Sequence, residues 1–170
     1  PSDLMKKIYG MGITHFDLPS PKHLQPFREL KGLTEDENLM GLCHLEAEEG
    51  TSFLGKPLHQ FETKVVSTIK KNLSLPHSIR NLPPVPYASE VLTQKEIDRI
   101  DFDPQRFEKA LSPLHPAESP FLLVGGRYGD WLLALGRIDL LKEMMAKVRE
   151  KGFTPVYSGL WATFCLPKAK

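Results

Sequence analysis

Short apolar runs alternate with helical patterns along most of the chain. Strand-like runs lie at 13–17, 38–46, 120–126 and 153–164, and they are apolar enough for strands covered by other layers. Between them apolar residues recur at helical spacing, most clearly over 137–152. Strands that alternate with helices in this way predict an α/β fold with a parallel sheet.

Helix start and stop signals fix several element boundaries. Ser20 before Pro21 predicts a helix start, and Gly32 predicts the end of the same helix. Thr93 with Glu96 has the spacing of a capping box, in which each residue bonds to the other's backbone N–H group.

Two segments are harder to assign. Residues 52–73 have the spacing of a helix but also the β-branched density of a strand, and we favour a helix followed by a strand. The cluster "LPPVPYASE" at 82–90 holds three prolines within five residues, so we expect a connection there rather than a helix or a central strand.

Right-handed crossovers would curl such units into a barrel or an open, doubly wound sheet. No G-x-G-x-x-G motif follows a predicted strand, so the main sequence signal of a dinucleotide-binding open sheet is missing. We therefore favour the barrel. A complete TIM-type (β/α)8 barrel needs about 250 residues. We therefore expect residues 1–170 to form a single domain that is an incomplete barrel, or a fragment of one.

Composition narrows the range of partners. The chain has 22 basic and 21 acidic side chains and no basic block, which argues against nucleic acid or an anionic membrane as partner. No apolar run approaches the length of a membrane span. Cys43 and Cys165 lie in apolar surroundings without metal-ligand spacing, so we expect buried thiols in a reducing cytoplasm, although a disulfide stays open.

Titratable side chains gather where the first two predicted strands end. His15 and Asp17 alternate, as do His44, Glu46 and Glu48, and alternate residues of a strand share one face. One hypothesis is acid–base chemistry at this edge. A second is a divalent metal, such as zinc, manganese or magnesium, held by His15, Asp17, His44 and Glu46. The alternative is that Asp17 caps a turn, the histidines lie in the core and the glutamates lie in solvent.

The stretch "VGGRYGDW" lies between the third apolar run and a helical pattern. The backbone of Gly125 and Gly126 has the freedom to cradle a phosphate, and Arg127 would add positive charge. A plain tight turn is the alternative explanation, since the lysine and serine of a Walker motif are missing.

Three segments resemble the aldo-keto reductase family. "GITHFD" is similar to that family's first-strand motif, "LGKPLHQFETKVVSTIK" (54–70) to a helix followed by a strand that ends in the catalytic lysine, and "VREKGFTPVYSG" to a later helix-to-strand passage. The resemblance implies a β/α barrel, NADPH as cofactor, and Asp17 and Lys70 as a catalytic pair. The family's tyrosine motif is missing, because no tyrosine occurs between Tyr9 and Tyr87.

These observations lead to three functional hypotheses. The first is a diverged oxidoreductase that acts on a small molecule with NADPH, with Asp17 and Lys70 in the site and His44 as proton donor in place of tyrosine. The second is a metal-assisted lyase or hydrolase that uses the metal ligands named above. The third is a non-catalytic barrel that pairs into a homo-oligomer to cover its open sheet edges.

Overall fold

The computed structural model describes residues 2–72 and 90–161, and its central element is a four-stranded parallel sheet. The strands β1 (His15–Leu18), β2 (Met40–Glu46), β6 (Phe121–Gly125) and β7 (Thr154–Ser158) lie in the order β1-β2-β6-β7. The predicted α/β class with parallel strands is therefore confirmed. Four strands are too few to close a full barrel, and the described residues form an open sheet.

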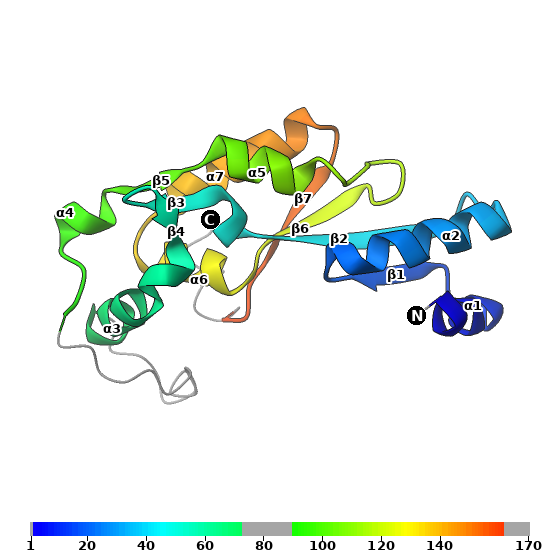
Figure 1. Cartoon of the computed structure of the whole chain (residues 1–170), viewed down its shortest axis with the longest axis horizontal. Helices are drawn as coiled ribbons and strands as arrows, with labels where there is room; N and C mark the ends of the chain where they lie inside the picture. Colours follow the sequence, from blue (N-terminus) through cyan, green and yellow to red (C-terminus); the bar gives the residue numbers. More distant parts are fainter. Residues whose placement is uncertain (1, 73–89, 162–170) are drawn as a thin grey trace.

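Helices connect these strands and extend beyond them (Figure 1). The helices are α1 (Ser2–Gly10), α2 (Leu24–Thr34), α3 (Glu62–Asn72), α4 (Gln94–Ile97), α5 (Pro104–Leu111), α6 (Gly126–Ala134) and α7 (Ile138–Glu150). Short 3-10 turns lie at Pro21–His23, Ala47–Gly50 and Leu58–Phe61. The predicted helix over 137–152 is confirmed as α7, and the capping box of Thr93 and Glu96 is present at the start of α4.

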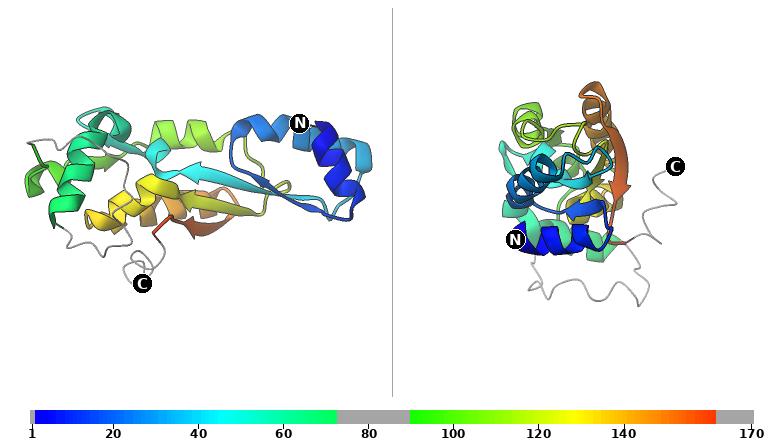
Figure 2. Two further views of the ribbon diagram at one scale, coloured as in Figure 1. Left: turned by 90° about the horizontal axis from the view of Figure 1, so that it is seen from below. Right: turned by 90° about the vertical axis from the view of Figure 1, so that its right-hand side faces the viewer.

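The main helices cover one face of the sheet. The strand order advances in one direction along the chain, so right-handed crossovers carry their helices to the same side. In both views of Figure 2, α2 and α5 lie on one side of the strands. The core beneath them contains Phe27 and Leu30 of α2, Phe107 of α5, and Met144 and Val148 of α7, all buried.

The opposite face of the sheet stays open among the described residues. Burial alternates along β1, where Phe16 and Leu18 are buried whereas His15 and Asp17 are exposed. Following this alternation and the register across the sheet, we define the open face by the side chains of His15, Asp17, Met40, Leu42, His44, Phe121, Leu123 and Val156. All of them are exposed or half-buried.

A second, smaller sheet lies between β2 and β6 in the sequence. Its strands β3 (Thr51–Phe53), β4 (Lys56–Pro57) and β5 (Ile100–Phe102) are antiparallel, in the order β4-β3-β5. With α3 and α4 it forms one end of an elongated molecule, whereas α1 and α2 lie at the other end (Figure 1).

Several predicted boundaries are wrong. Helix α2 continues through Gly32 to Thr34, because Glu35 adopts the left-handed conformation that ends it. The predicted helix-then-strand order over 52–73 is reversed, since β3 and β4 come first and the β-branched run lies in α3. The predicted connection at 82–90 lies outside the described residues except for Glu90, and so does Cys165. Cys43 is buried, as predicted.

Within residues 2–72 and 90–161, every helix is too short or too polar to cross a lipid bilayer.

Candidate active site at the strand ends

The carboxyl ends of the parallel strands meet at one edge of the sheet. Glu46, the last residue of β2, lies in register with Gly125 of β6, which in turn lies in register with Ser158 of β7. This edge is where α/β proteins place most of their binding and catalytic groups, because loops and helix N-termini converge there.

Asp17 and His44 form the closest polar pair on the open face. The Nε2 atom of His44 lies 2.5 Å from Oδ1 of Asp17, across the β1–β2 boundary. The Asp17 side chain is 64% exposed and that of His44 is 28% exposed, so solvent and small molecules can reach the pair. A carboxylate can only accept, so Nε2 of His44 is the donor in this contact, and Nδ1 is left for a substrate.

Glu46 lies two residues beyond His44 on the same strand and contacts the start of α6. Its carboxylate oxygens occupy the position that a β-carbon on Gly126 would need. Desolvation raises the pKa of Glu46 above its ordinary value, and the charges of Arg127 and His44 oppose that rise. The positive end of α6 opposes it as well. We refer to Asp17, His44 and Glu46 together as the strand-end site.

The predicted phosphate cradle forms a sharp strand-to-helix turn. Gly125 and Gly126 adopt positive φ values of 133° and 64°. Arg127 forms an ion pair with Glu62, with Nη1 and Oε1 3.3 Å apart, and its guanidinium lies over the ring of Tyr128. Because the carboxyl group of Glu46 occupies the space at this turn, a phosphate bound there would have to displace it.

Lys70 lies far from the strand-end site. It belongs to the last turn of α3, not to the end of a strand, and α3 is at the opposite end of the molecule from β1 (Figure 1). The structure gives no support to the predicted pairing of Asp17 with Lys70. The resemblance placed a strand over residues that form a helix, and Asp17 pairs with His44 instead.

The predicted metal ligands do not converge. Among residues 2–72 and 90–161, no three His, Cys, Asp or Glu side chains lie close enough together to hold a metal ion. Asp17 and His44 meet, whereas His15 lies at the other end of β1 with its Nδ1 atom 3.0 Å from Oγ1 of Thr14. Strand alternation places these side chains on one face but does not bring all four to one point.

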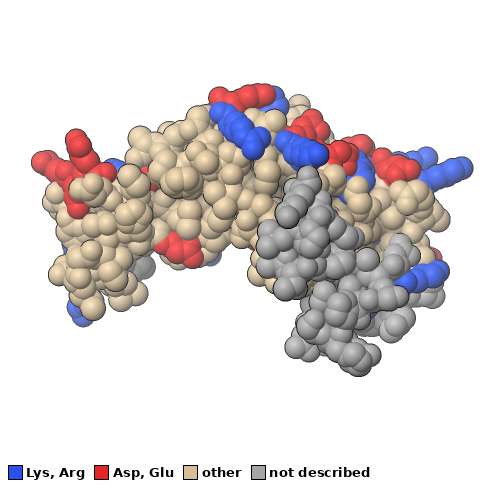
Figure 3. Space-filling view, turned by 180° about the vertical axis from the view of Figure 1, so that it is seen from behind, with Lys and Arg blue, Asp and Glu red and all other residues tan. Residues whose placement is uncertain are grey.

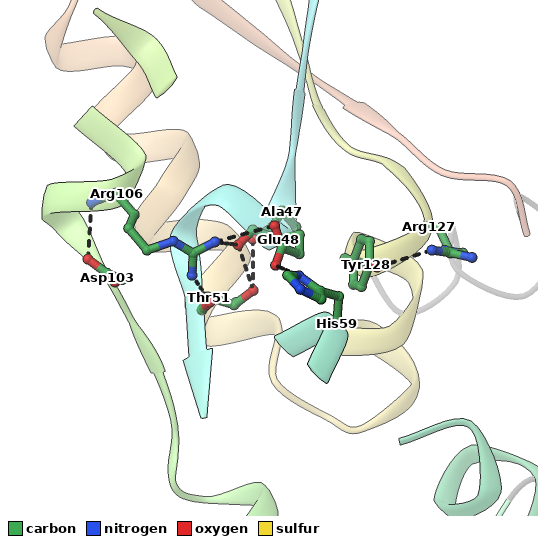
Figure 4. Close-up of polar contacts among 8 residues, drawn as sticks. All are labelled: Ala47, Glu48, Thr51, His59, Asp103, Arg106, Arg127 and Tyr128. Atoms are coloured by element: carbon green, nitrogen blue, oxygen red, sulfur yellow. Dashed lines mark hydrogen bonds and ion pairs between the residues drawn. The ribbon is translucent and has the colours of Figure 1, made fainter. Parts of the chain in front are cut away.

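A network around Glu48 was not predicted from the sequence (Figure 4). The Oε1 atom of Glu48 lies 2.7 Å from Nδ1 of His59, and Arg106 donates from Nη2 to Glu48 and from Nη1 to the carbonyl of Thr51. The Glu48 side chain is 14% exposed, so the carboxylate is held firmly by its partners. His59 lies in the 3-10 turn Leu58–Phe61 and Arg106 on α5, and no pattern of spacing connects them in the sequence.

A cavity of about 590 Å³ opens at the same edge of the sheet, on the side that the helices cover. It lies between the ends of β1 and β2 and the helices α2 and α5. Its polar lining residues are Ser20, His44, Glu46, Glu49, Arg106 and Lys109, and the others are mostly apolar. This volume suits a small organic molecule.

Asp130 is a buried carboxylate that ties α6 to the chain after β7. It accepts hydrogen bonds from the Tyr157 hydroxyl at 2.5 Å, from the Leu160 N–H at 2.7 Å and from the Trp161 N–H at 2.9 Å. Since these donors belong to the protein, Asp130 is a structural residue and not a member of the strand-end site.

Comparisons with known proteins do not assign the chain to a family. The chain matches no protein-family model, and no similarity to a curated protein or to a solved structure reaches significance.

Proposed function

We propose that this protein is an enzyme that transfers protons to and from a small organic substrate at the strand-end site. The observation that carries the proposal is the 2.5 Å contact between Asp17 and His44, which fixes an accessible imidazole at the carboxyl edge of a parallel sheet. Glu46 lies nearby, and its raised pKa suits it to donate a proton, whereas His44 accepts one.

The chemistry follows from the two environments. Nδ1 of His44 accepts a proton from the substrate, and the Asp17 carboxylate stabilises the imidazolium that forms. Glu46, which keeps its proton to higher pH than an ordinary glutamate, donates a proton elsewhere on the substrate. Together these steps move one proton off the substrate and one onto it, as in the isomerisation of a carbonyl compound.

An oxidoreductase is a narrower version of the same proposal. In it His44 would give its proton to the carbonyl oxygen while NADPH supplies the hydride, and Lys70 would take no part. The Glu46 carboxylate at the Gly125–Gly126 turn gives no support to phosphate binding there. Titration with NADPH, followed by cofactor fluorescence, tests this version; absence of binding at millimolar cofactor removes it and leaves the proton-transfer proposal intact.

The scaffold proposal is that the open sheet is part of a β/α barrel. Two features support it: consecutive parallel neighbours in one direction, and helices on one face. In such a barrel the strand-end site would lie at the mouth, where active sites of this fold are found.

The proposal is tested by solvent deuterium exchange into a panel of small carbonyl compounds, followed by NMR. We expect His44→Gln and Asp17→Asn to lower the exchange rate of any substrate, His44→Gln by roughly a hundredfold to ten-thousandfold. His23→Gln is the matched control, because His23 contacts the Ser20 carbonyl and is not a partner of Asp17 or His44. Exchange that survives both substitutions in folded protein contradicts the proposal.

A further inference from the structure

The open face carries a groove that begins at Asp17 of the strand-end site and runs along the sheet away from Glu46. It has a volume of about 430 Å³ and lies over β1, β2 and the start of β6. The residues that line it are His15, Phe16, Asp17, Met40, Gly41, Leu42, Pro120 and Phe121.

The groove floor is apolar and accessible. Phe121 is 50% exposed, and Met40 and Leu42 are half-buried on the same face. Parallel sheets normally have both faces covered, so exposed apolar side chains on this face are an unusual feature for the fold. Seen from behind, uncharged surface dominates the middle of the molecule, whereas charged side chains gather along the upper edge (Figure 3).

The charge at the groove has one sign. Among the described residues that line it, Asp17 is the one carboxylate and none is Lys or Arg. Oδ1 of Asp17 faces His44, which leaves Oδ2 to accept another donor from solvent. The other ionisable side chain in the described lining is that of His15.

We propose that this groove binds a flat apolar molecule that carries a cationic amino group. The apolar body lies on Met40, Leu42 and Phe121, and the amino group donates to Oδ2 of Asp17. The volume falls within the range of ligand sites, and the single carboxylate selects a cation over an anion. The inference deepens the proposed function by naming a substrate class, and it rests on that proposal only for what happens after binding.

The test compares three probes of one shape: 1-naphthylmethylamine, 1-naphthylmethanol and 1-naphthoate. Titrations at pH 8 and low salt are followed by the NMR signals of the Met40 and Leu42 methyl groups. We expect the amine to shift both residues and to bind most tightly, and naphthoate most weakly. Asp17→Asn should weaken the amine by about fivefold, the upper end for an exposed ion pair, and leave the alcohol unchanged. Leu42→Asn should weaken all three.

Controls separate this inference from the proposed function. Glu29→Gln removes an exposed carboxylate from α2, on the helix-covered side, and should leave amine binding unchanged. Amine binding without deuterium exchange in any substrate supports the groove and removes the proton-transfer proposal. Equal affinity for the three probes, or shifts confined to other residues, overturns the groove. So does a dimer in sedimentation whose contact protects Met40 and Leu42, because the occupant is then a second copy.

Discussion

Glu46 and Gly126 are coupled by direct contact at the residue scale. A side chain at position 126 would be strained by the φ of 64° and would also collide with the Glu46 carboxylate. Gly136 offers a matched case, because its φ of 79° is similar but nothing lies within 4 Å of the position a β-carbon would take. The two glycines therefore separate backbone strain from the contact with Glu46.

We predict that Gly136→Ala lowers the free energy of unfolding by about 1–2 kcal/mol, the cost of a left-handed L-residue. Gly126→Ala should lower the free energy of unfolding by clearly more, because the new β-carbon also displaces the Glu46 carboxyl group. When Gly126→Ala is made in a Glu46→Ala background, its extra loss of unfolding free energy over Gly136→Ala should become smaller, because the collision with Glu46 is absent. Urea unfolding measures all of these values, and equal costs for the two glycine variants would contradict the contact.

At the element scale, Asp130 joins α6 to the segment after β7. Its carboxylate satisfies one hydroxyl and two backbone N–H groups in a fully buried position. A β-carbon on Gly159 would also meet Oδ1 of Asp130, so the chain passes very close to the carboxylate there. The end of β7 is thus held by a side chain from another element.

We predict that Asp130→Ala lowers the free energy of unfolding by about 3–5 kcal/mol, because three donors lose their charged acceptor together. Tyr157→Phe removes one of those donors and should cost about 1–2 kcal/mol. Thermal and denaturant unfolding give both values. A loss for Asp130→Ala no larger than for Tyr157→Phe would mean that the backbone donors contribute nothing.

Local signals predicted some elements well and others poorly. The capping box of Thr93 and Glu96 and the apolar stripe of α7 are determined by neighbours in the sequence, so the predictions were confirmed. The run "KVVST" was misassigned because its Val65 and Val66 are buried by tertiary packing on a helix, which outweighs their preference for strands. Gly32 failed as a stop signal because Glu35 supplies the left-handed residue instead.

At the scale of the whole molecule, the candidate site was also predicted only where regular strand geometry determines it, and not where tertiary contacts do. Strand alternation placed Asp17 and His44 on one face, and parallel neighbours brought them into contact. The network of Glu48, His59 and Arg106 depends on tertiary contacts between the turn at Leu58–Phe61, Glu48 and α5. No periodic pattern in the sequence predicts such contacts. The likeness around Lys70 implied a strand, whereas these residues form α3 in the structure.

Whole-molecule stability should depend on pH through Glu46. Its folded-state pKa is raised above the ordinary 4.5, so the folded chain holds this proton more tightly than the unfolded chain does. The resulting stabilisation is fully present below pH 4.5 and is lost as pH rises through the folded-state pKa.

We therefore predict that the unfolding free energy of the unmodified protein falls relative to that of Glu46→Gln as pH rises from 4 to 7. Urea unfolding at several pH values measures the difference. Glu37→Gln, on the exposed turn before β2, is the control for loss of a carboxylate in general. A difference between the unmodified protein and Glu46→Gln that stays constant with pH would contradict the desolvation of Glu46.

The Glu46 side chain also fills the space at the start of α6 that a free anion would need. An anion that approached this helix would have to displace a group that the fold holds in place, at an effective concentration on the order of millimolar or higher. A chain with almost no net charge would in this way keep micromolar anions from the helix start by occupied space, without a surrounding field of negative charge.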